Sequence, residues 1–107
     1  MTTFDKREDA FEKKFAHDAE LKFKAEARRN KLLGLWAAGL LGKTGADAEA
    51  YAKAVVASDF ERAGDGDVFD KIRTDFDAAG VAQSDHQLRR TMDEMMQTAI
   101  DQIRSEV

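Results

Sequence analysis

Glycine joints between apolar-periodic segments most constrain what this chain can fold into. The chain contains no proline, and within the segments apolar residues recur every three or four positions, the spacing that lines one face of a helix. Glycine tolerates the left-handed backbone conformation that ends many helices. The joints hold Gly42 and Gly45, Gly64 and Gly66, and Gly80. Because no segment shows the alternation of a strand, the sequence predicts an all-α four-helix bundle.

Each joint is followed by residues with the three-residue spacing of a capping box. The pairs are Thr44 with Asp47, Asp67 with Asp70, and Ser84 with Gln87. Stop and start signals therefore agree at all three joints. The predicted helices cover about 19–41, 46–63, 68–79 and 84–106, within one bundle domain at 19–107.

The first helical pattern is longer than the other three and cannot be covered by them. It runs from Phe4 to Leu41, and its most apolar part, 32–41, predicts that Trp36 is the central core residue of this helix. Gly34 and Gly39 inside this part weaken a helix, so we expect a neighbouring helix to approach closely at both. The overhang is then the N-terminal arm at 1–18.

The arm carries three phenylalanines on one helical face. Phe4, Phe11 and Phe15 follow at i, i+7 and i+11 with no apolar partner in their own segment. A solvated segment of this length is marginal as a helix in water, so we expect the arm to be disordered or marginally helical until a partner orders it. The alternative is an arm that folds back on its own bundle or frays.

Charge and composition exclude several classes of function. The 107 residues carry 17 basic and 21 acidic groups, a net charge of -4, which disfavours a nucleic-acid binder. The absence of cysteine excludes disulfides and thiolate metal sites. No serine or threonine has a convincing base partner, so we expect no enzyme. The longest uncharged run has eleven residues, too short to insert in a membrane, and the start lacks the apolar segment of a secretory signal. We expect a cytoplasmic protein that is monomeric when free.

The calcium-like spacing from Asp59 to Asp70 is a weak signal. Ala63 and Gly66 stand where an oxygen ligand or a larger residue would be needed. We therefore expect helix capping there and no metal site.

Three stretches resemble a known family. The FDKRE start at 4–8, FKAEARRNKLLGLW at 23–36 and the segment 51–59 are similar to the ζ subunit of α-proteobacterial rotary ATP synthases. The resemblance implies a four-helix bundle whose N-terminal arm inserts as a helix between an α and a β subunit of the ATPase head, reaches the central stalk and blocks rotation in the hydrolytic direction. It also implies association with the cytoplasmic face of the membrane-bound synthase. Carried over to this chain, the candidate inhibitory residues are Phe4, Asp5, Arg7, Glu8, Phe11, Lys14 and Phe15.

The segment after the arm is basic, and its role has three interpretations. Residues 19–43 hold six basic and two acidic groups, a local charge of +4. The candidate contacts are Lys24, Arg28, Arg29 and Lys31. In the first interpretation these residues form a solvated face on which Glu20 pairs with Lys24. In the second they contact an acidic rim on the synthase, and in the third they bind a phosphate group. The last interpretation gives the alternative function, a helical regulatory module that senses a nucleotide or another small ligand; no cofactor is expected beyond such weak nucleotide binding.

Overall fold

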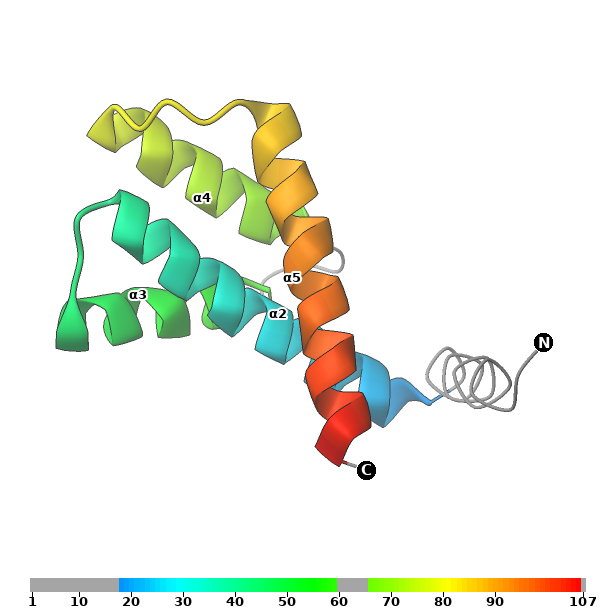
Figure 1. Ribbon diagram of the computed structural model, residues 1–107. Coiled ribbons are helices and arrows are strands. Elements are labelled where there is room, and N and C mark those ends of the chain that lie inside the picture. The colour runs from blue at the N-terminus through cyan, green and yellow to red at the C-terminus, as the bar shows by residue number, and fades with distance from the viewer. Residues whose placement is uncertain (1–17, 60–65, 107) are drawn as a thin grey trace.

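The computed structural model describes residues 18–59 and 66–106 and shows an all-α four-helix bundle (Figure 1). The helices of this part are α2 (Ala19–Leu40), α3 (Gly45–Ser58), α4 (Gly66–Ala79) and α5 (Asp85–Glu106). α2 and α5 lie within one residue of the predicted bounds at each end. α4 begins two residues earlier than predicted, and α3 ends at Ser58, where 63 was expected.

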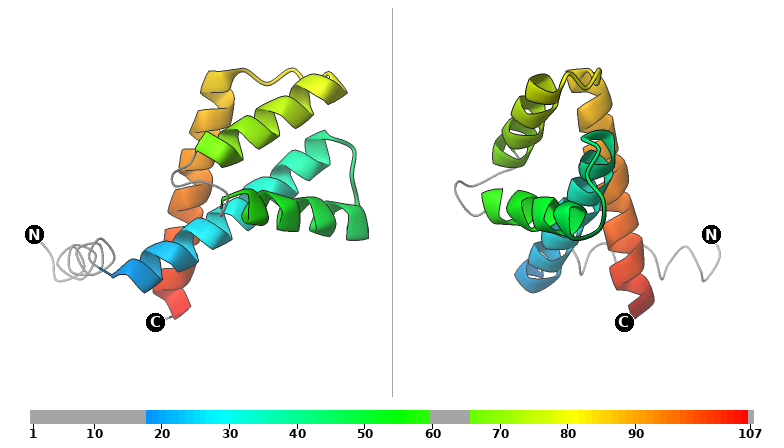
Figure 2. Two further views of the ribbon diagram at one scale, coloured as in Figure 1. Left: turned by 180° about the vertical axis from the view of Figure 1, so that it is seen from behind. Right: turned by 90° about the vertical axis from the view of Figure 1, so that its left-hand side faces the viewer.

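α2 is the central element of the bundle. α3 turns back along α2, and α5 crosses α2 so that the last turns of α5 lie beside the first half of α2 (Figures 1 and 2). α4 packs on α3 and α5 over the other end of α2. The fully buried side chains at the centre come from all four helices: Leu33, Val55, Val68, Ile72, Phe76 and Leu88. The end of α5 thus lies beside the first half of α2 (Figures 1 and 2).

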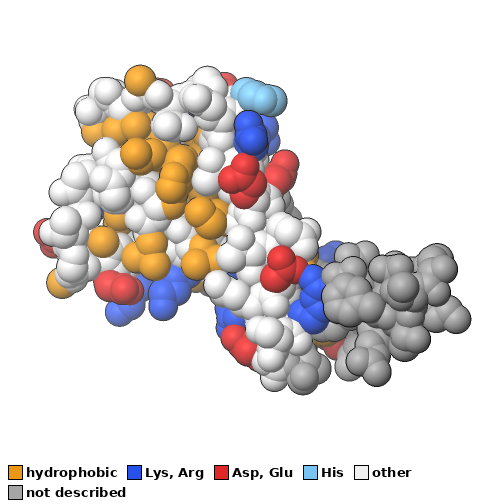
Figure 3. All heavy atoms as spheres, viewed as in Figure 1, with side chains coloured by type: hydrophobic (Ala, Val, Ile, Leu, Met, Phe, Trp, Pro, Cys, Tyr) orange, Lys and Arg blue, Asp and Glu red, His pale blue; other side chains and the backbone are white. Residues whose placement is uncertain are grey.

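Hydrophobic side chains are visible on one side of the molecule, over the region of α2, α3 and α4, whereas charged side chains gather along α5 (Figure 3). Several apolar residues are only partly buried at the edge of the core. These are Trp36, Leu41, Ala48, Val81 and Met95. Four short helices cannot enclose every apolar side chain, because a small domain has a large surface relative to its volume.

The start of α2 is set by Asp18. Its side chain accepts hydrogen bonds from the backbone N–H groups of Glu20 and Leu21 at 3.0 and 3.2 Å. The backbone of Asp18 is extended, with φ -102° and ψ 106°, so this residue is a true N-cap. Glu20 in the first turn adds a favourable interaction with the helix dipole. α2 thus begins directly after residue 18, the last residue of the predicted arm.

Glycine ends α2 as the sequence predicts. Gly42 has φ +79°, a left-handed conformation that costs a residue with a Cβ more than it costs glycine. The N–H of Lys43 then donates to the carbonyl of Ala38 at 2.9 Å, which satisfies a carbonyl in the last turn. The chain can therefore reverse direction and lay α3 against α2.

Of the two close approaches predicted in α2, only one exists. A Cβ built on Gly34 would lie 2.7 Å from the Cα of Ala52, so α3 touches α2 at this point. The prediction for Gly39 is wrong, since no described atom outside its own helix backbone lies within 4 Å of its Cβ position and the residue is exposed. Gly39 lies on the side of the last turn that faces solvent, which the sequence spacing alone did not reveal.

Trp36 is not the central core residue. It is partly buried and packs edge-to-face on Phe76, with ring centroids 5.7 Å apart. The fully buried positions of this part of α2 are Leu33, Ala37 and Ala38. Small side chains occupy the tight contact with α3 around Gly34, and the large indole lies at the edge, where there is room for it.

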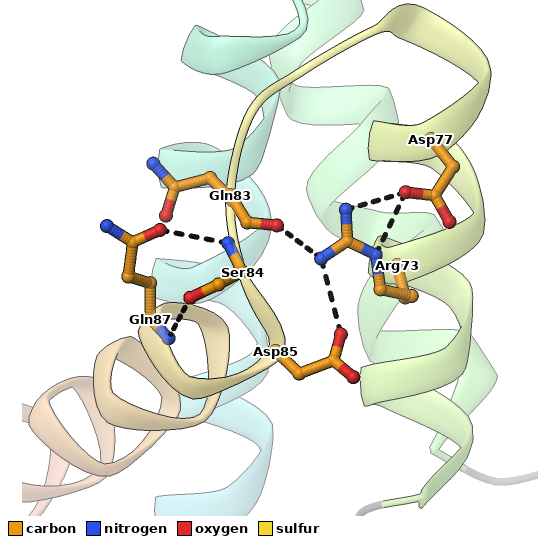
Figure 4. Close-up of polar contacts among 6 residues, drawn as sticks. All are labelled: Arg73, Asp77, Gln83, Ser84, Asp85 and Gln87. Carbon is orange, nitrogen blue, oxygen red and sulfur yellow. Dashed lines mark hydrogen bonds and ion pairs between the residues drawn. The ribbon is translucent and has the colours of Figure 1, made fainter.

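The predicted caps have different outcomes. The Ser84 capping box is confirmed: the Ser84 N–H donates to Gln87 Oε1 at 2.9 Å and the Gln87 N–H donates to Ser84 Oγ at 3.1 Å (Figure 4). Thr44 has the extended backbone of an N-cap but makes no side-chain capping bond, so that prediction is wrong. Asp67 lies inside the first turn of α4 because the helix already begins at Gly66, so it is not the cap.

Arg73 joins α4 to the turn before α5. Its guanidinium binds Asp77 at 2.7 Å on its own helix and Asp85 at 3.4 Å at the start of α5. It also donates to the backbone carbonyl of Gln83 (Figure 4). This cation and the Ser84 box together fix the direction in which α5 leaves the turn.

Candidate functional site

The seven candidate inhibitory residues of the arm lie outside the residues that the structure describes. They are Phe4, Asp5, Arg7, Glu8, Phe11, Lys14 and Phe15. Their roles therefore stay predictions. The structure does describe the second group of candidates, the basic residues of α2 that follow the arm directly.

Arg28 forms a bidentate ion pair with Glu106 at the end of α5. The two guanidinium nitrogens lie 2.6 and 3.1 Å from the two carboxylate oxygens. The hydrogen bond from Arg28 lowers the pKa of Glu106 below its ordinary value of 4.5. Paired bonds of this geometry are the more specific kind of ion pair. The contact joins the first half of α2 to the last turn of α5.

Lys24 forms the ion pair predicted with Glu20, at 3.6 Å. The side chains are 60% and 79% exposed, so the pair contributes little to stability and its partners can exchange easily. Lys31 is exposed on the same side of α2, two turns further along. Lys24, Arg28 and Lys31 thus share one surface, as their spacing predicts.

Arg29 does not lie on that surface. It is only 2% exposed, and its Nε donates to the side-chain oxygen of Asn30 at 2.9 Å. Asn30 donates in turn to Asp59, beyond the end of α3, at 3.0 Å. The neighbouring position on a helix is rotated by about 100°, which carries Arg29 from the basic surface toward the interior.

A signal for this burial was present in the sequence. Arg29 lies four residues after Ala25 and four before Leu33, and both of these are fully buried. It therefore belongs to the core stripe by spacing. The positive charge of Arg29 instead suggested that it lies on the exposed basic surface of α2.

An open groove runs beside the basic surface. It has a volume of about 560 Å³, and its lining consists of Phe23, Lys24, Ala27, Arg28, Lys31, Val56 and Glu106. Phe23 is 53% exposed although it is a large apolar side chain. A second hollow of about 300 Å³ shares Lys31 and Val56 with the first and continues it along α3 to Glu49. We call the two together the α2 groove.

Of the residues that line the α2 groove, sequence reasoning found Lys24, Arg28 and Lys31 and missed the others, of which three are informative. Phe23 could have been found, because it is a phenylalanine away from the core stripe of α2. Val56 follows the fully buried Val55, but it is itself only partly buried. Glu106 had no signal, since it lies 78 residues from Arg28 and only the crossing of α2 and α5 brings the two together.

A second polar cluster joins α3 to α4. The Tyr51 hydroxyl donates to Asp75 at 2.7 Å, and Lys71 Nζ donates to the same carboxylate oxygen at 3.2 Å. Burial and then the Asp75 hydrogen bond raise the pKa of Tyr51 above its ordinary value. Lys43 and Lys71 lie 5.9 and 5.2 Å from the centre of the ring. These contacts hold α3 against α4.

Among residues 18–59 and 66–106, no group of three or more histidine, cysteine, aspartate or glutamate side chains could hold a metal ion. None of the four described helices is long and apolar enough to cross a membrane.

Comparison with known proteins identifies the family. A family model described as ATPase inhibitor subunit zeta matches residues 1–102. The chain belongs to the zeta family. The match includes the arm as well as the bundle, and the family is by its description one of regulatory subunits that inhibit an ATPase.

A solved structure agrees with the zeta fold described above. A protein determined by solution NMR is 45% identical, matches 81% of this chain and 99% of its own, and superposes with a TM-score of 0.71. A search of curated proteins found no match.

Proposed function

We propose that this protein inhibits ATP hydrolysis by the rotary ATP synthase through its N-terminal arm. The arm inserts as a helix between an α and a β subunit of the ATPase head, contacts the central stalk and stops rotation. The observation that carries the proposal is the zeta family match, which begins at residue 1 and so includes the arm. The resemblance of the FDKRE start to that family supports the same assignment.

The apolar content of the arm gives the insertion a driving force. Burying a phenylalanine contributes about 1.5–3 kcal/mol, so Phe4, Phe11 and Phe15 together supply roughly 5–9 kcal/mol toward ordering and binding the segment. We expect the charged candidates to set the register and specificity of binding more than its affinity. These candidates are Asp5, Arg7, Glu8 and Lys14.

The bundle acts as the carrier of the arm. Asp18 caps α2 at Ala19, so an inserted arm would be joined directly to a rigid helix of 22 residues. Such a helix is about 33 Å long. A body of this size outside the head would limit how deep the arm can enter and would resist rotation of the stalk beneath it.

The test adds the full chain to isolated ATPase head and follows ATP hydrolysis. Replacing both Phe11 and Phe15 by alanine removes about 3 kcal/mol or more of binding and should raise the half-inhibitory concentration roughly 100-fold. Leu40→Ala is the matched control, because Leu40 is an apolar side chain of the bundle that is already 42% exposed. It should inhibit as the unmodified chain does.

Deletion of residues 2–15 gives the stronger form of the test. Inhibition should disappear while helical circular dichroism and the unfolding transition of the bundle persist. If the truncated protein inhibits as well as the full chain, the arm mechanism is wrong.

A nucleotide site on α2 is the weaker proposal. Arg28 is held by Glu106 and Arg29 is buried, which leaves Lys24 and Lys31 as the cations available to a phosphate. Two exposed lysines on flexible side chains form a poorly defined phosphate site. Titration of ATP with backbone amide shifts as the readout tests this proposal. Localised shifts at Lys24 and Lys31 would support it.

The proposed role needs neither catalysis nor a cofactor. An inhibitor of this kind acts at the cytoplasmic face of the membrane-bound synthase, and its partners are the α, β and central-stalk subunits. Its action depends on occupying a site, so the free protein is proposed to be a monomer.

A further inference from the structure

The α2 groove combines an apolar floor with a charged rim. Phe23, Ala27 and Val56 supply the apolar side chains, and Lys24, Arg28 and Lys31 stand beside them. The continuation along α3 adds Lys53 and Glu49. A row of cations beside an exposed phenylalanine fits a segment that presents carboxylates around an apolar side chain.

The charge of this surface differs from that of the rest of the protein. The groove lining has four cations, Lys24, Arg28, Lys31 and Lys53, against two anions, Glu106 and Glu49, whereas the whole chain has a net charge of -4. A local excess of positive charge on an acidic protein favours an acidic partner.

One of the cations, Lys24, can change its partner at little cost. Lys24 is paired with Glu20, at 3.6 Å and with both side chains largely exposed. A carboxylate of a partner can replace Glu20 there without loss of a buried contact. Arg28, by contrast, is fixed by Glu106 and forms a rigid wall of the groove.

The position of the groove decides which partner it meets. Phe23 follows Asp18 by five residues, about 8 Å along the helix axis. Whatever holds the arm must therefore present its surface near the first turns of α2. The groove lies on the half of α2 that directly follows, in sequence, the arm that the proposed function assigns to the ATPase head.

We propose that the α2 groove is a second docking surface that binds an acidic segment at the rim of the same ATPase head. The inference rests on the proposed function and adds that the arm and the groove have separate roles. The arm blocks rotation, and the groove supplies affinity and sets the angle at which α2 leaves the head. Loss of the groove contact then weakens binding without reducing the inhibition reached at saturation.

The test measures binding and inhibition separately with the full chain. The chain has no cysteine, so Ala82→Cys in the exposed turn before α5 provides a single site for a fluorescent label. Anisotropy then gives the Kd for isolated ATPase head, and hydrolysis at saturating inhibitor gives the extent of inhibition.

Charge reversal in the groove is compared with charge reversal elsewhere. Lys24→Glu should raise the Kd about fivefold at low salt, because it replaces an attraction at the rim by a repulsion. Arg90→Glu on α5 is the control, since Arg90 is 75% exposed and also belongs to an i,i+4 pair, with Glu94. Its Kd should stay within about twofold of the unmodified chain.

The apolar floor is tested in the same way. Phe23→Ala should raise the Kd about tenfold through lost apolar contact, and Leu40→Ala should leave it unchanged. All four variants should inhibit fully at saturation. The dependence of Kd on salt should become weaker in Lys24→Glu, because one screened attraction has been removed.

The outcomes separate the two proposals. If the unmodified chain inhibits but Lys24→Glu and Phe23→Ala bind as tightly as their controls, the groove proposal is overturned and the arm mechanism stands. Equal weakening by Lys24→Glu and Arg90→Glu also overturns it, since the effect would then be one of total charge. A dimer in sedimentation of the free chain that Lys24→Glu dissociates would assign the groove to a second copy and overturn it as well. No binding by the unmodified chain would overturn both proposals.

Discussion

Replacement of Gly34 by alanine tests the tightest contact in the bundle. The added Cβ would lie 2.7 Å from Ala52 Cα, 3.2 Å from Ala52 Cβ and 3.3 Å from Val55 Cβ. Carbon atoms in contact are normally about 3.5–4.0 Å apart, so α3 must withdraw from α2 by about 1 Å. The nearest atom belongs to the backbone and cannot rotate away. The substitution therefore disturbs the helix pair with the most extensive contact in the described residues.

Two opposing effects set the magnitude. Alanine favours the helix over glycine by about 1 kcal/mol. Overpacking a well-packed contact costs about 1–3 kcal/mol, and a backbone obstruction places Gly34→Ala toward the upper end. The net expectation is a destabilisation of about 1–2 kcal/mol, which corresponds to a fall in Tm of roughly 10 °C for a domain of this size.

Gly39→Ala is the matched control on the same helix. Its Cβ meets no atom within 4 Å, so only the preference of the helix for alanine acts. It should raise the free energy of unfolding by about 0.4–1 kcal/mol. Urea unfolding followed by circular dichroism at 222 nm measures both variants, and an unchanged slope shows that the same surface is exposed. Equal stabilisation by the two substitutions would refute the close approach of α3 at Gly34.

The two remaining predictions concern the caps and the Arg28 ion pair. Ser84→Ala should lower the free energy of unfolding by about 1 kcal/mol, because it removes the hydrogen bond from the Gln87 N–H. Thr44→Ala should lower it by less than about 0.5 kcal/mol, because Thr44 makes no side-chain capping bond. Comparable losses in the two variants would contradict the cap assignment. Since Arg28 lowers the pKa of Glu106 in the folded state, the stabilisation from this pair is present above pH 4.5 and is lost as the pH falls through the lowered value. A carboxyl titration by NMR should show Glu106 below 4.5 in the unmodified chain and closer to 4.5 in Arg28→Gln, and an unaltered titration would contradict the pairing.

Much of the fold could be predicted because its signals are local. The Ser84 and Gln87 bonds join residues three apart, and the left-handed Gly42 is a property of one residue. The family resemblance was also local, since it rested on short runs of sequence, and it is confirmed by the match over residues 1–102. The roles of the arm residues rest on that resemblance and stay predictions.

The errors came from questions that no local signal answers. Gly34 and Gly39 look alike in sequence, yet only one of them faces α3. Thr44 has the residue type and backbone of a cap but makes no capping bond. Arg29 was predicted to be on the basic surface because of its charge. It is buried, because its spacing places it on the same side of α2 as Ala25 and Leu33.

The sequence by itself determined that the described residues form four helices, where α2 begins and ends, and which family the chain belongs to. Each of these depends on torsions, hydrogen bonds and patterns that span a few residues. Only the tertiary structure decided the candidate groove. It exists because α5 crosses α2 and brings Glu106 to Arg28 over 78 residues, while α3 places Val56 beside Lys31. Such contacts depend on how whole helices pack, and the free energy that selects the packing is distributed over the entire core.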